Sequence, residues 1–509
     1  MVEGRQSVIL PKGTPRVNIL FATTEAVPFC KTGGLGDVCG ALPIELAELG
    51  HQPAIVMPAF RQAYESGQPL EDLGVEIEVK IAGTPVHGGL LRSTLPGSEV
   101  PVYLIEQHDY YNRRALYFEG GEDYKDNCER FVFFSRGVLE VIEQVLPETE
   151  LVHCHDWTSG LVPVYLQTQS SPHVAFDQIA TLFTIHNLAY QGNFWHWDME
   201  LTGLDWKYFN WQQMEFYGQL NFLKTGLAFA DVLSTVSPRY AQEIQTPEQG
   251  CGLDGLLRHR SEDLFGVLNG CDYREWNPAT DPHLPMNYDV NTFAAGKAAC
   301  KAALQRELGL PERSDLPLFV IVSRLADQKG FDLIAPLLER YAAQGNTQWA
   351  ILGTGDPGYH HRVAELAGQY PEQIAVRLEF SNPLAHRMEA GGDIFVMPSR
   401  YEPCGLNQMY SLRYGTVPLV RETGGLADTI TNASPETLFQ GTANGFSFLD
   451  TTVEALALTI ERALASYGNP DEWRQIVTTG MQQDWSWKAS ARRYDELYRH
   501  TLARRASLV

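Results

Sequence analysis

The chain of 509 residues has no long hydrophobic run. No stretch approaches the roughly 20 consecutive apolar residues that a membrane-spanning helix needs. The first residues, MVEGRQSVILPKGTPR, also lack the extended apolar core of a secretory signal peptide, and they are short for a transit peptide. We therefore expect no membrane partner.

Positive charge is scarce in this sequence. The chain has 39 Lys and Arg residues against 62 Asp and Glu residues, which gives a net charge of −23. Proteins that bind nucleic acids or anionic membrane surfaces carry a basic footprint, so this balance argues against both as the main partner. An anionic substrate must instead be held by a local cluster of Arg, Lys and backbone N–H donors.

Two metal-binding patterns are also missing. The eight cysteines are scattered without a C-x-x-C pair, which favours a reducing cytosol or stroma and argues against a structural zinc site. No D-x-D triplet occurs, so there is no obvious magnesium site for a phosphate substrate. The sequence predicts neither a metal nor another cofactor.

The chain is long and apolar enough for two or three globular domains, with 44% hydrophobic and 20% charged residues. Strand and helix signals alternate with short loops, which favours an α/β protein with parallel sheets. Each half opens with a strand whose exit loop carries basic residues and glycine. We therefore predict two Rossmann-like domains that offer the carboxyl edges of their sheets to a deep shared cleft. Residues 277–285 are predicted to be a linker, and residues 205–230 to be helical.

The second half contains the most informative stretch, from Asp393 to Asp428. A predicted strand at 394–397 ends just before Glu402, and a second at 417–420 ends before the Thr423–Gly425 loop. Both strand ends lead through glycine into a helix, and helix starts offer unpaired N–H groups to anions. A carboxylate such as that of Glu402 does not suit phosphate, so we expect it to face hydroxyl groups. The alternative is a well-capped α/β unit with a solvated glutamate.

The first half repeats this pattern. A strand at 17–22 is followed by Lys31, Gly33 and Gly34 and then by an amphipathic helix, an arrangement that can cradle phosphate. The lysine precedes the glycines, so this is not a Walker loop, and glycines needed only for a tight turn explain it about as well. Two later strands end in Asp156 and in His186-Asn187, which makes a polar site at their ends more probable than a structural role.

Together these strand ends offer cations and amide donors for a diphosphate, and polar acceptors for sugar hydroxyls. The cations are Lys31, Arg324 and Lys329, and the acceptors are Asp156, Asn269 and Glu402. Since no metal site is evident, the residues predict a metal-independent transferase that acts on a nucleotide-activated sugar.

Ten motifs in order carry a resemblance over residues 17–500. The chain resembles the ADP-glucose-dependent glycogen and starch synthases of bacteria and plastids, which have the GT-B fold. The motifs are KTGGLGDV (31–38), HDW (155–157), TIHNLAYQG (184–192), TVSPRYAQEI (235–244), NGCDYREWNP (269–278), SRLADQKG (323–330), GTGD (353–356), PSRYEPCGLNQ (398–408), RYGTVPLV (413–420) and TGGLADT (423–429).

The resemblance implies elongation of an α-1,4-glucan from ADP-glucose, with retention at the anomeric carbon. It implies an acceptor-side domain at 1–266, an ADP-glucose domain at 267–480, and a C-terminal helix at 481–509 that crosses back onto the first domain. It further implies a bacterial cytoplasmic location, or the plastid stroma for a processed plant or algal form. The residues leave the oligomeric state open.

The resemblance also assigns roles residue by residue. Lys31, Asp156, His186, Arg324, Lys329 and Glu402 would be catalytic. Arg324 and Lys329 would hold the diphosphate, Glu402 would bind glucose hydroxyls, and the His186 carbonyl would face the anomeric carbon. The substrate-binding residues would be Gly33, Gly34, Asp37, Asn187, Asn269, Gly353, Thr354, Phe380, Cys404, Gly405, Leu406, Thr423, Gly424 and Gly425.

Retention by double displacement requires a carboxylate close beneath the sugar, and the His186 loop contains none. We therefore favour a front-face route in which the departing phosphate deprotonates the incoming hydroxyl. Three positions depart from the family pattern: Thr158 replaces a histidine, Phe380 a tyrosine, and Asn407 a threonine or isoleucine. A same-fold transferase that uses UDP-glucose or another acceptor is the main alternative, and a non-catalytic glucan-binding scaffold is a weaker one.

Overall fold

The computed structural model describes residues 16–508, and the chain forms two compact units. The first unit consists of the described residues up to Ser234, of Cys251–Leu264, and of the residues from Ala491 onward. The second consists of Thr235–Gly250 and Phe265–Ser490. Compared with the boundaries expected at 266 and 480, the second unit also takes residues 235–250 and extends to Ser490.

The first unit is built on a nine-stranded sheet in the order β14-β13-β9-β8-β1-β2-β5-β4-β3. Its strands are β1 (Asn18–Ala22), β2 (Gln52–Pro58), β3 (Glu71–Ile81), β4 (Thr84–Thr94), β5 (Pro101–Glu106), β8 (Leu151–His155), β9 (Ala180–Ile185), β13 (Val232–Thr235) and β14 (Leu264–Gly266). The helices of this unit are α1 (Gly34–Glu48), α2 (Arg61–Glu65), α3 (His108–Tyr111), α4 (Asn127–Gln144), α5 (Val162–Thr168), α6 (Met199–Thr202), α7 (Phe222–Phe229) and α9 (Asp254–His259).

Parallel pairing in this sheet gathers the predicted site residues of the first unit at one edge. β1 pairs in parallel with β2 and β8, and β8 pairs in parallel with β9. The carboxyl ends of β1, β8 and β9 therefore lie side by side, and they are followed by Thr23, Asp156 and His186. This is the edge at which parallel sheets bind ligands.

The last helix, α19 (Trp487–Ala506), packs on the first unit from Ala491 onward. The Asp495 carboxylate accepts a hydrogen bond from buried His51 Nε2 at 2.9 Å, and the Tyr498 hydroxyl shares one with His153 Nδ1 at 2.9 Å. Near the end of the helix, the Arg505 guanidinium pairs with Asp231. The C-terminal residues are thus part of the core that supports β8.

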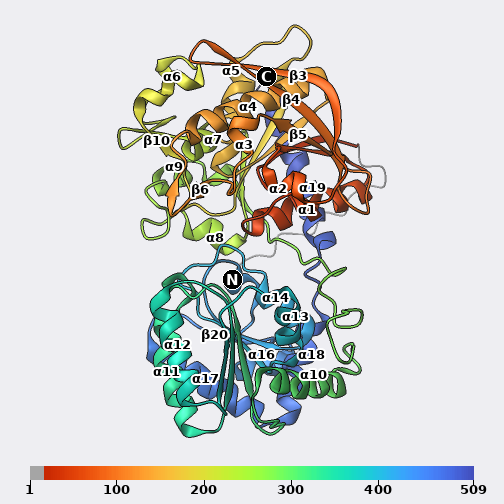
Figure 1. Cartoon of the computed structure of the whole chain (residues 1–509), viewed down its shortest axis with the longest axis vertical. Helices are drawn as coiled ribbons and strands as arrows, with labels where there is room; N and C mark the ends of the chain where they lie inside the picture. Colours follow the sequence, from red (N-terminus) through yellow and green to blue (C-terminus); the bar gives the residue numbers. More distant parts are fainter. Residues whose placement is uncertain (1–15, 509) are drawn as a thin grey trace. The chain divides into compact units, whose positions relative to one another are not determined.

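The second unit is built on a six-stranded parallel sheet in the order β17-β16-β15-β18-β19-β20 (Figure 1). Its strands are β15 (Leu318–Val322), β16 (Gln348–Leu352), β17 (Ile374–Arg377), β18 (Ile394–Met397), β19 (Val417–Arg421) and β20 (Phe446–Phe448). Its helices are α8 (Pro238–Glu243), α10 (Phe293–Leu308), α11 (Phe331–Gln344), α12 (Pro357–Gln369), α13 (Asn382–Gly391), α14 (Asn407–Tyr414), α15 (Gly424–Thr429), α16 (Pro435–Gln440), α17 (Val453–Tyr467) and α18 (Pro470–Gln482).

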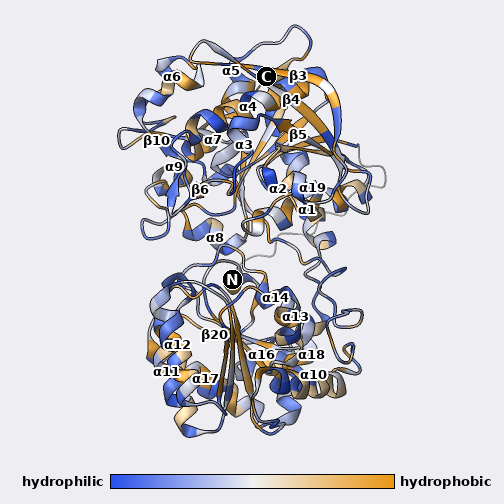
Figure 2. Ribbon diagram, viewed as in Figure 1, coloured by the Kyte–Doolittle hydropathy of each residue, from blue (hydrophilic) through white to orange (hydrophobic). Residues whose placement is uncertain are grey.

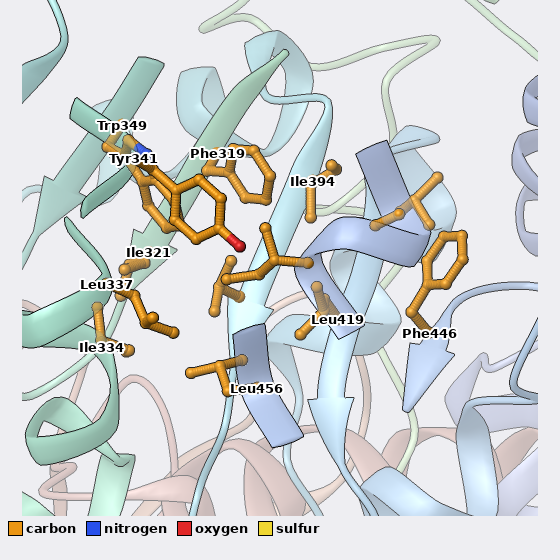
Figure 3. Packing of buried hydrophobic residues seen from close by; sticks show 14 of the residues in the cluster. Phe319, Ile321, Ile334, Leu337, Tyr341, Trp349, Ile394, Leu419, Phe446 and Leu456 are labelled. Carbon is orange, nitrogen blue, oxygen red and sulfur yellow. The ribbon is translucent and has the colours of Figure 1, made fainter. Parts of the chain in front are cut away.

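Hydrophobic residues are concentrated on these strands because helices cover both faces of the sheet (Figure 2). Successive strand residues point to opposite faces, so β15 supplies two separate clusters. Phe319 and Ile321 pack on one face together with Trp349, as Figure 3 shows. Leu318 and Val320 pack on the other face. The two clusters fix the strands whose ends carry the predicted site.

The predicted linker at 277–285 is wrong, because these residues are packed into the second unit. Asp281 is 1% exposed, and its carboxylate bonds His386 at 2.8 Å and accepts from the Tyr414 hydroxyl at 2.6 Å. Trp276 stacks on the His386 ring with centroids 3.8 Å apart. The proline- and aspartate-rich stretch is therefore a buried connection that packs on α13 and α14. It is not an exposed hinge.

This connection predicts a pH-dependent stability. Burial lowers the pKa of His386, but hydrogen bonds to Asp281 and Glu275 outweigh it and raise the pKa to about 9 from 6.5. A folded pKa above the unfolded value gives stabilisation that is complete below about pH 6.5 and is lost as the pH rises through about 9.

His386→Gln removes this titration. The excess unfolding free energy of the wild type over the variant is expected to shrink by about 3 kcal/mol between pH 6 and pH 9.5. Urea denaturation of both proteins across this range measures the difference. Parallel pH profiles would contradict the assignment.

Candidate active site

The second unit brings two predicted residues, Lys329 and Glu402, into direct contact. The Lys329 Nζ lies 2.5 Å from Glu402 Oε2, and the Ser399 hydroxyl donates to the same oxygen at 3.0 Å. The lysine and glutamate side chains are only 16% and 11% exposed. Lys329 follows β15 and Glu402 follows β18, and these strands are neighbours in the sheet. An ion pair is therefore already formed at the carboxyl edge.

Arg324 lies in the same loop as Lys329, and the GTGD turn supports its backbone. The amide of Leu325 donates to the Thr354 carbonyl at 2.9 Å, and a Cβ on Gly353 would lie 1.8 Å from the Ser323 carbonyl oxygen. Only glycine therefore fits at 353. The Arg324 guanidinium donates to Gln328 Oε1 at 2.9 Å. Phe380, one of the predicted substrate-binding residues, is 92% exposed.

The two predicted sets of backbone amide donors differ in whether they already have an acceptor within the unit. Among the described residues, no group accepts a hydrogen bond from the amides of Gly405 and Leu406, which precede α14. The amide of Thr423 instead donates to Arg421 O, and that of Gly425 donates to the carbonyl oxygens of Glu402 and Pro403. A phosphate could therefore use the first set, whereas the second set is engaged within the unit.

Gly424 is engaged by a glutamate that the sequence reasoning missed. Both Glu243 carboxylate oxygens lie 3.1 Å from the Gly424 amide and 3.3–3.4 Å from the Thr423 hydroxyl. Arg239 pairs with the same carboxylate at 3.1 Å. In this structure the amides of Gly424 and Gly425 donate to acceptors within the second unit, and the substrate-binding role of residues 423–425 stays a prediction. The signal was present, since Glu243 is the second-to-last residue of the motif TVSPRYAQEI (235–244).

Asn269 and Cys404 lie together in the second unit. The Cys404 thiol is hydrogen-bonded to the Asn269 backbone, and burial raises the pKa of this thiol to about 12. The Asn269 side chain is 5% exposed, and its Oδ1 atom has no hydrogen-bond partner among the described residues. Cys404 is therefore a neutral packing group, and Asn269 has an acceptor left for a ligand.

The glycine loop of the first unit encloses a carboxylate. Glu25 Oε2 accepts from the amides of Thr32 at 2.5 Å and Gly33 at 3.1 Å, and Oε1 accepts from the Tyr117 hydroxyl at 2.8 Å. The Gly33 amide, which was predicted to bind substrate, donates to Glu25 in this structure, and its role toward a substrate stays a prediction. Glu25 follows β1 by three residues, and the motifs gave no sign of this role.

Lys31 and Gly34 flank this enclosed carboxylate. The Lys31 ammonium is 48% exposed and pairs with Asp37 at 2.7 Å, so the two predicted residues lie together. Gly34 begins α1, and a Cβ there would meet nothing within 4 Å. The lysine can therefore exchange its partner for a substrate anion.

Asp156 connects the ends of β8 and β9. Its buried carboxylate accepts from the amide of His186 at 2.7 Å and also from the amide of Asn187. Burial raises the pKa of Asp156 to about 7. The residue has φ 54° and ψ −176°, a region that is populated almost only by glycine. Asp156 therefore holds the His186-Asn187 turn at a cost in backbone strain.

Two buried histidines, His153 and His155, lie behind this turn and adjoin the partly buried His186. His186 Nε2 and His155 Nδ1 share a hydrogen bond at 3.0 Å, and the His155 ring packs on His153 with centroids 4.0 Å apart. Burial lowers the pKa of His186 to about 3 and places those of His155 and His153 well below the ordinary value. All three rings are neutral at physiological pH, so none supplies a charge to a substrate.

Two of the three departures from the family pattern, Thr158 and Asn407, make hydrogen bonds within their own units. Thr158 is 2% exposed, and its hydroxyl shares a hydrogen bond with the Thr24 hydroxyl at 3.1 Å. The Asn407 amide donates to the Val322 carbonyl at 2.8 Å and supports the start of the Arg324 loop.

Two kinds of feature are absent from residues 16–508. No cluster of three or more His, Cys, Asp or Glu side chains is placed to hold a metal ion. No helix in this part of the chain is long and apolar enough to cross a membrane.

Comparisons with known proteins cover both units. Residues 18–259 match the starch synthase catalytic domain, and residues 307–478 match the glycosyl transferases of group 1. A glycogen synthase from Rhodopirellula baltica is 48% identical over 96% of this chain and 98% of its own length. A glycogen synthase from Anaeromyxobacter dehalogenans is also 48% identical, over 96% of this chain and 100% of its own length.

A solved structure agrees with these relatives. It is the catalytic domain of starch synthase IV from Arabidopsis thaliana bound to ADP and acarbose, with a TM-score of 0.87 and 32% identity. The match covers 96% of this chain and 100% of that one. The predicted fold class, two Rossmann-like domains of the GT-B type, is confirmed. The chain belongs to the family of glycogen and starch synthases, which are glycosyltransferases.

Proposed function

We propose that this protein transfers glucose from ADP-glucose to the non-reducing 4-hydroxyl of an α-1,4-glucan, with retention of configuration and without a metal ion. The glycogen synthase relatives and the starch synthase structure bound to ADP and acarbose support the donor and acceptor classes. The observation that carries the proposal is the Lys329–Glu402 pair, because it joins a phosphate-binding cation to an acceptor for sugar hydroxyls.

The second unit supplies the donor-binding groups in this proposal. Arg324 and Lys329 neutralise the diphosphate, and the amides of Gly405 and Leu406 donate to its oxygens. Glu402 accepts from glucose hydroxyls while it remains within reach of Lys329. Protein cations take the role that a magnesium ion has in other phosphate-transfer sites, which is the basis for proposing that no metal is required.

The first unit supplies the groups that face the reacting carbon. Asp156 directs its carboxylate to the amides of His186 and Asn187, so it holds the turn and is not oriented as a nucleophile. The His186 carbonyl would then stabilise positive charge at the anomeric carbon.

The location proposed is a reducing cytoplasm, in keeping with eight free cysteines.

The proposed step is a front-face displacement. The bond from the anomeric carbon to the phosphate oxygen breaks, and its electron pair leaves with ADP. The acceptor O4 forms the new glycosidic bond on the same face, and its proton passes to the departing phosphate oxygen. No oxidant, reductant or further reactant is needed.

Glucose transfer from ADP-glucose and from UDP-glucose to maltotriose in EDTA tests this function. We expect strong turnover with ADP-glucose, and NMR of the first product should show a new α-linkage. Preference for UDP-glucose would overturn the donor, and a requirement for added metal would overturn metal independence. Isolation of a covalent glucosyl–enzyme adduct would contradict the front-face step.

A further inference from the structure

The segment between residues 190 and 217 of the first unit exposes an unusual number of aromatic side chains. The exposed fractions are 60% for Tyr190, 63% for Trp195, 53% for Trp197, 38% for Trp206, 74% for Trp211 and 82% for Tyr217. The four tryptophans are four of the ten in the chain. Contiguous exposed apolar surface of this kind marks an interaction site.

The sequence pattern alone predicted a helix over 205–230, which is wrong for most of this segment. Only α7, from Phe222, is an α-helix there, and residues before it form a short 3₁₀ turn (Trp206–Tyr208) and the strands β11 (Glu215–Phe216) and β12 (Gln219–Asn221). β12 pairs with β10 (Asn193–Phe194) and β11. The tryptophans are therefore displayed by a built substructure, next to α6 at one margin of the unit (Figure 1).

Three of the tryptophans form a connected series, which we call the aromatic platform: Trp195, Trp197 and Trp206. The ring centroids of Trp195 and Trp197 are 6.4 Å apart, and those of Trp197 and Trp206 are 5.6 Å apart. The planes cross at 69° and 72°, so each ring braces the next by an edge-to-face contact. A face of each ring can then remain open.

A hydrogen bond and the buried residues of α6 also hold the platform in place. The Trp206 indole N–H donates to Glu200 Oε1 at 2.6 Å, which fixes that ring. Met199 and Thr202 of α6 are fully buried, and the Thr202 carbonyl accepts from the buried Tyr165 hydroxyl at 2.8 Å. A platform of fixed rings loses little conformational entropy when a ligand binds.

The platform is continuous with the candidate site of the same unit. Phe194, which precedes Trp195, contacts the Trp157 ring at a centroid distance of 6.0 Å. Trp157 directly follows Asp156, and a Cβ on Gly192 would lie 2.4 Å from the Trp157 ring. The chain thus runs from the His186-Asn187 turn to the platform along one packed path.

The charges around the platform favour a neutral ligand. Glu200, Asp198 and Asp205 outnumber two nearby cations, Lys207, whose side chain is 64% exposed, and Arg136, whose guanidinium lies near Gly203. An anionic membrane or a nucleic acid would meet this acidic surface unfavourably. The apolar C–H face of a pyranose ring suits an indole face, and its hydroxyls can bond the carboxylates at the rim.

We propose that Trp195, Trp197 and Trp206 form a docking surface for the α-glucan chain, separate from the groups that bind the donor. This inference rests on the proposed function, since it extends the acceptor class to a second contact. A long glucan would occupy the platform and the site together, whereas a short maltooligosaccharide would reach only the site. The platform would therefore raise the affinity for polymer through effective concentration.

The test compares the Trp195→Ala/Trp197→Ala double variant with Phe439→Ala, which removes a 94% exposed aromatic ring from the second unit. Glycogen binding is measured without donor by retardation in glycogen-containing native gels. Initial rates are measured with glycogen and with maltotriose. We expect about fivefold to tenfold weaker glycogen binding and a matching rise in KM for glycogen in the double variant. The kcat with saturating maltotriose should stay within about twofold, and Phe439→Ala should match the wild type.

The Trp195→Phe/Trp197→Phe variant keeps aromatic faces and should retain most of the binding, which separates ring loss from misfolding. Unchanged glycogen retardation in the alanine double variant would overturn the proposal. So would a change in oligomeric state by gel filtration with glycogen binding intact, because the surface would then bind a second copy. If the wild type binds glycogen through these rings but transfers no glucose, the proposed function fails and the docking surface stands.

Discussion

Replacing Lys329 with methionine is expected to lower kcat/KM for ADP-glucose by about 10²-fold to 10³-fold. The ammonium lies 2.5 Å from Glu402 Oε2 in a setting where both side chains are largely buried. Removing one partner of such a pair leaves an uncompensated charge and costs about 3–5 kcal/mol. The same substitution removes a proposed cation from the donor diphosphate. Steady-state rates at varied ADP-glucose measure the loss.

The control for this prediction is the Lys329→Met/Glu402→Gln double variant, which removes both charges while nearly conserving shape. If the pair serves only stability, this variant should regain the folding stability and the activity together. In our account it regains thermal stability but stays at least about 10²-fold impaired, because the donor has lost both contacts. Recovery of activity in the double variant would assign the pair to structure alone.

Replacing Asp156 with alanine is expected to lower activity by at least about 10²-fold. The Asp156 carboxylate is the acceptor for the buried amides of His186 and Asn187. Each buried N–H group that loses its acceptor costs about 1–3 kcal/mol, so the turn that positions the His186 carbonyl should lose its fixed geometry. Rates with saturating ADP-glucose and maltotriose measure this effect on kcat.

A matched glycine variant separates the two roles of Asp156. Its backbone, at φ 54° and ψ −176°, costs about 1–3 kcal/mol for a residue with a Cβ and little for glycine. Asp156→Gly should therefore be as inactive as Asp156→Ala, yet more stable than it by about 1–2 kcal/mol in urea denaturation. Equal stability of the two variants would show that the backbone at this position is not strained, and normal activity of either would remove Asp156 from the site.

The parallel sheets were predictable because their strands are short apolar runs bounded by glycine and polar residues. The predicted strand at 394–397 coincides with β18, and the one at 417–420 differs from β19 by one residue. It was also predictable that Lys329 and Glu402 lie near each other, since both follow strands whose carboxyl ends share one edge of the sheet. The ion pair between them was not predictable. The pattern of strands indicates the sheet edge at which a side chain lies, but it does not indicate which partner the side chain bonds.

Buried carboxylates account for most of what the sequence could not predict. Glu25 and Glu243 each bond the amides of a glycine loop that the motifs alone favoured for phosphate. Whether a loop amide faces a ligand or an internal acceptor depends on residues distant in sequence, 181 positions away for Glu243 and Gly424. The helix prediction was wrong for residues 205–221 for a different reason. The aromatic residues of this segment recur at helical spacing, but they are displayed on a surface.

The most direct test of the central claim is calorimetric titration of ADP into the wild type and the Lys329→Met variant in EDTA. The account predicts that the wild type binds ADP without any metal ion, and that the variant binds it about 10-fold to 100-fold more weakly, as the loss of a charge-assisted contact requires. Equal ADP affinity in the two proteins, or ADP binding that develops only when Mg²⁺ is added, would contradict it.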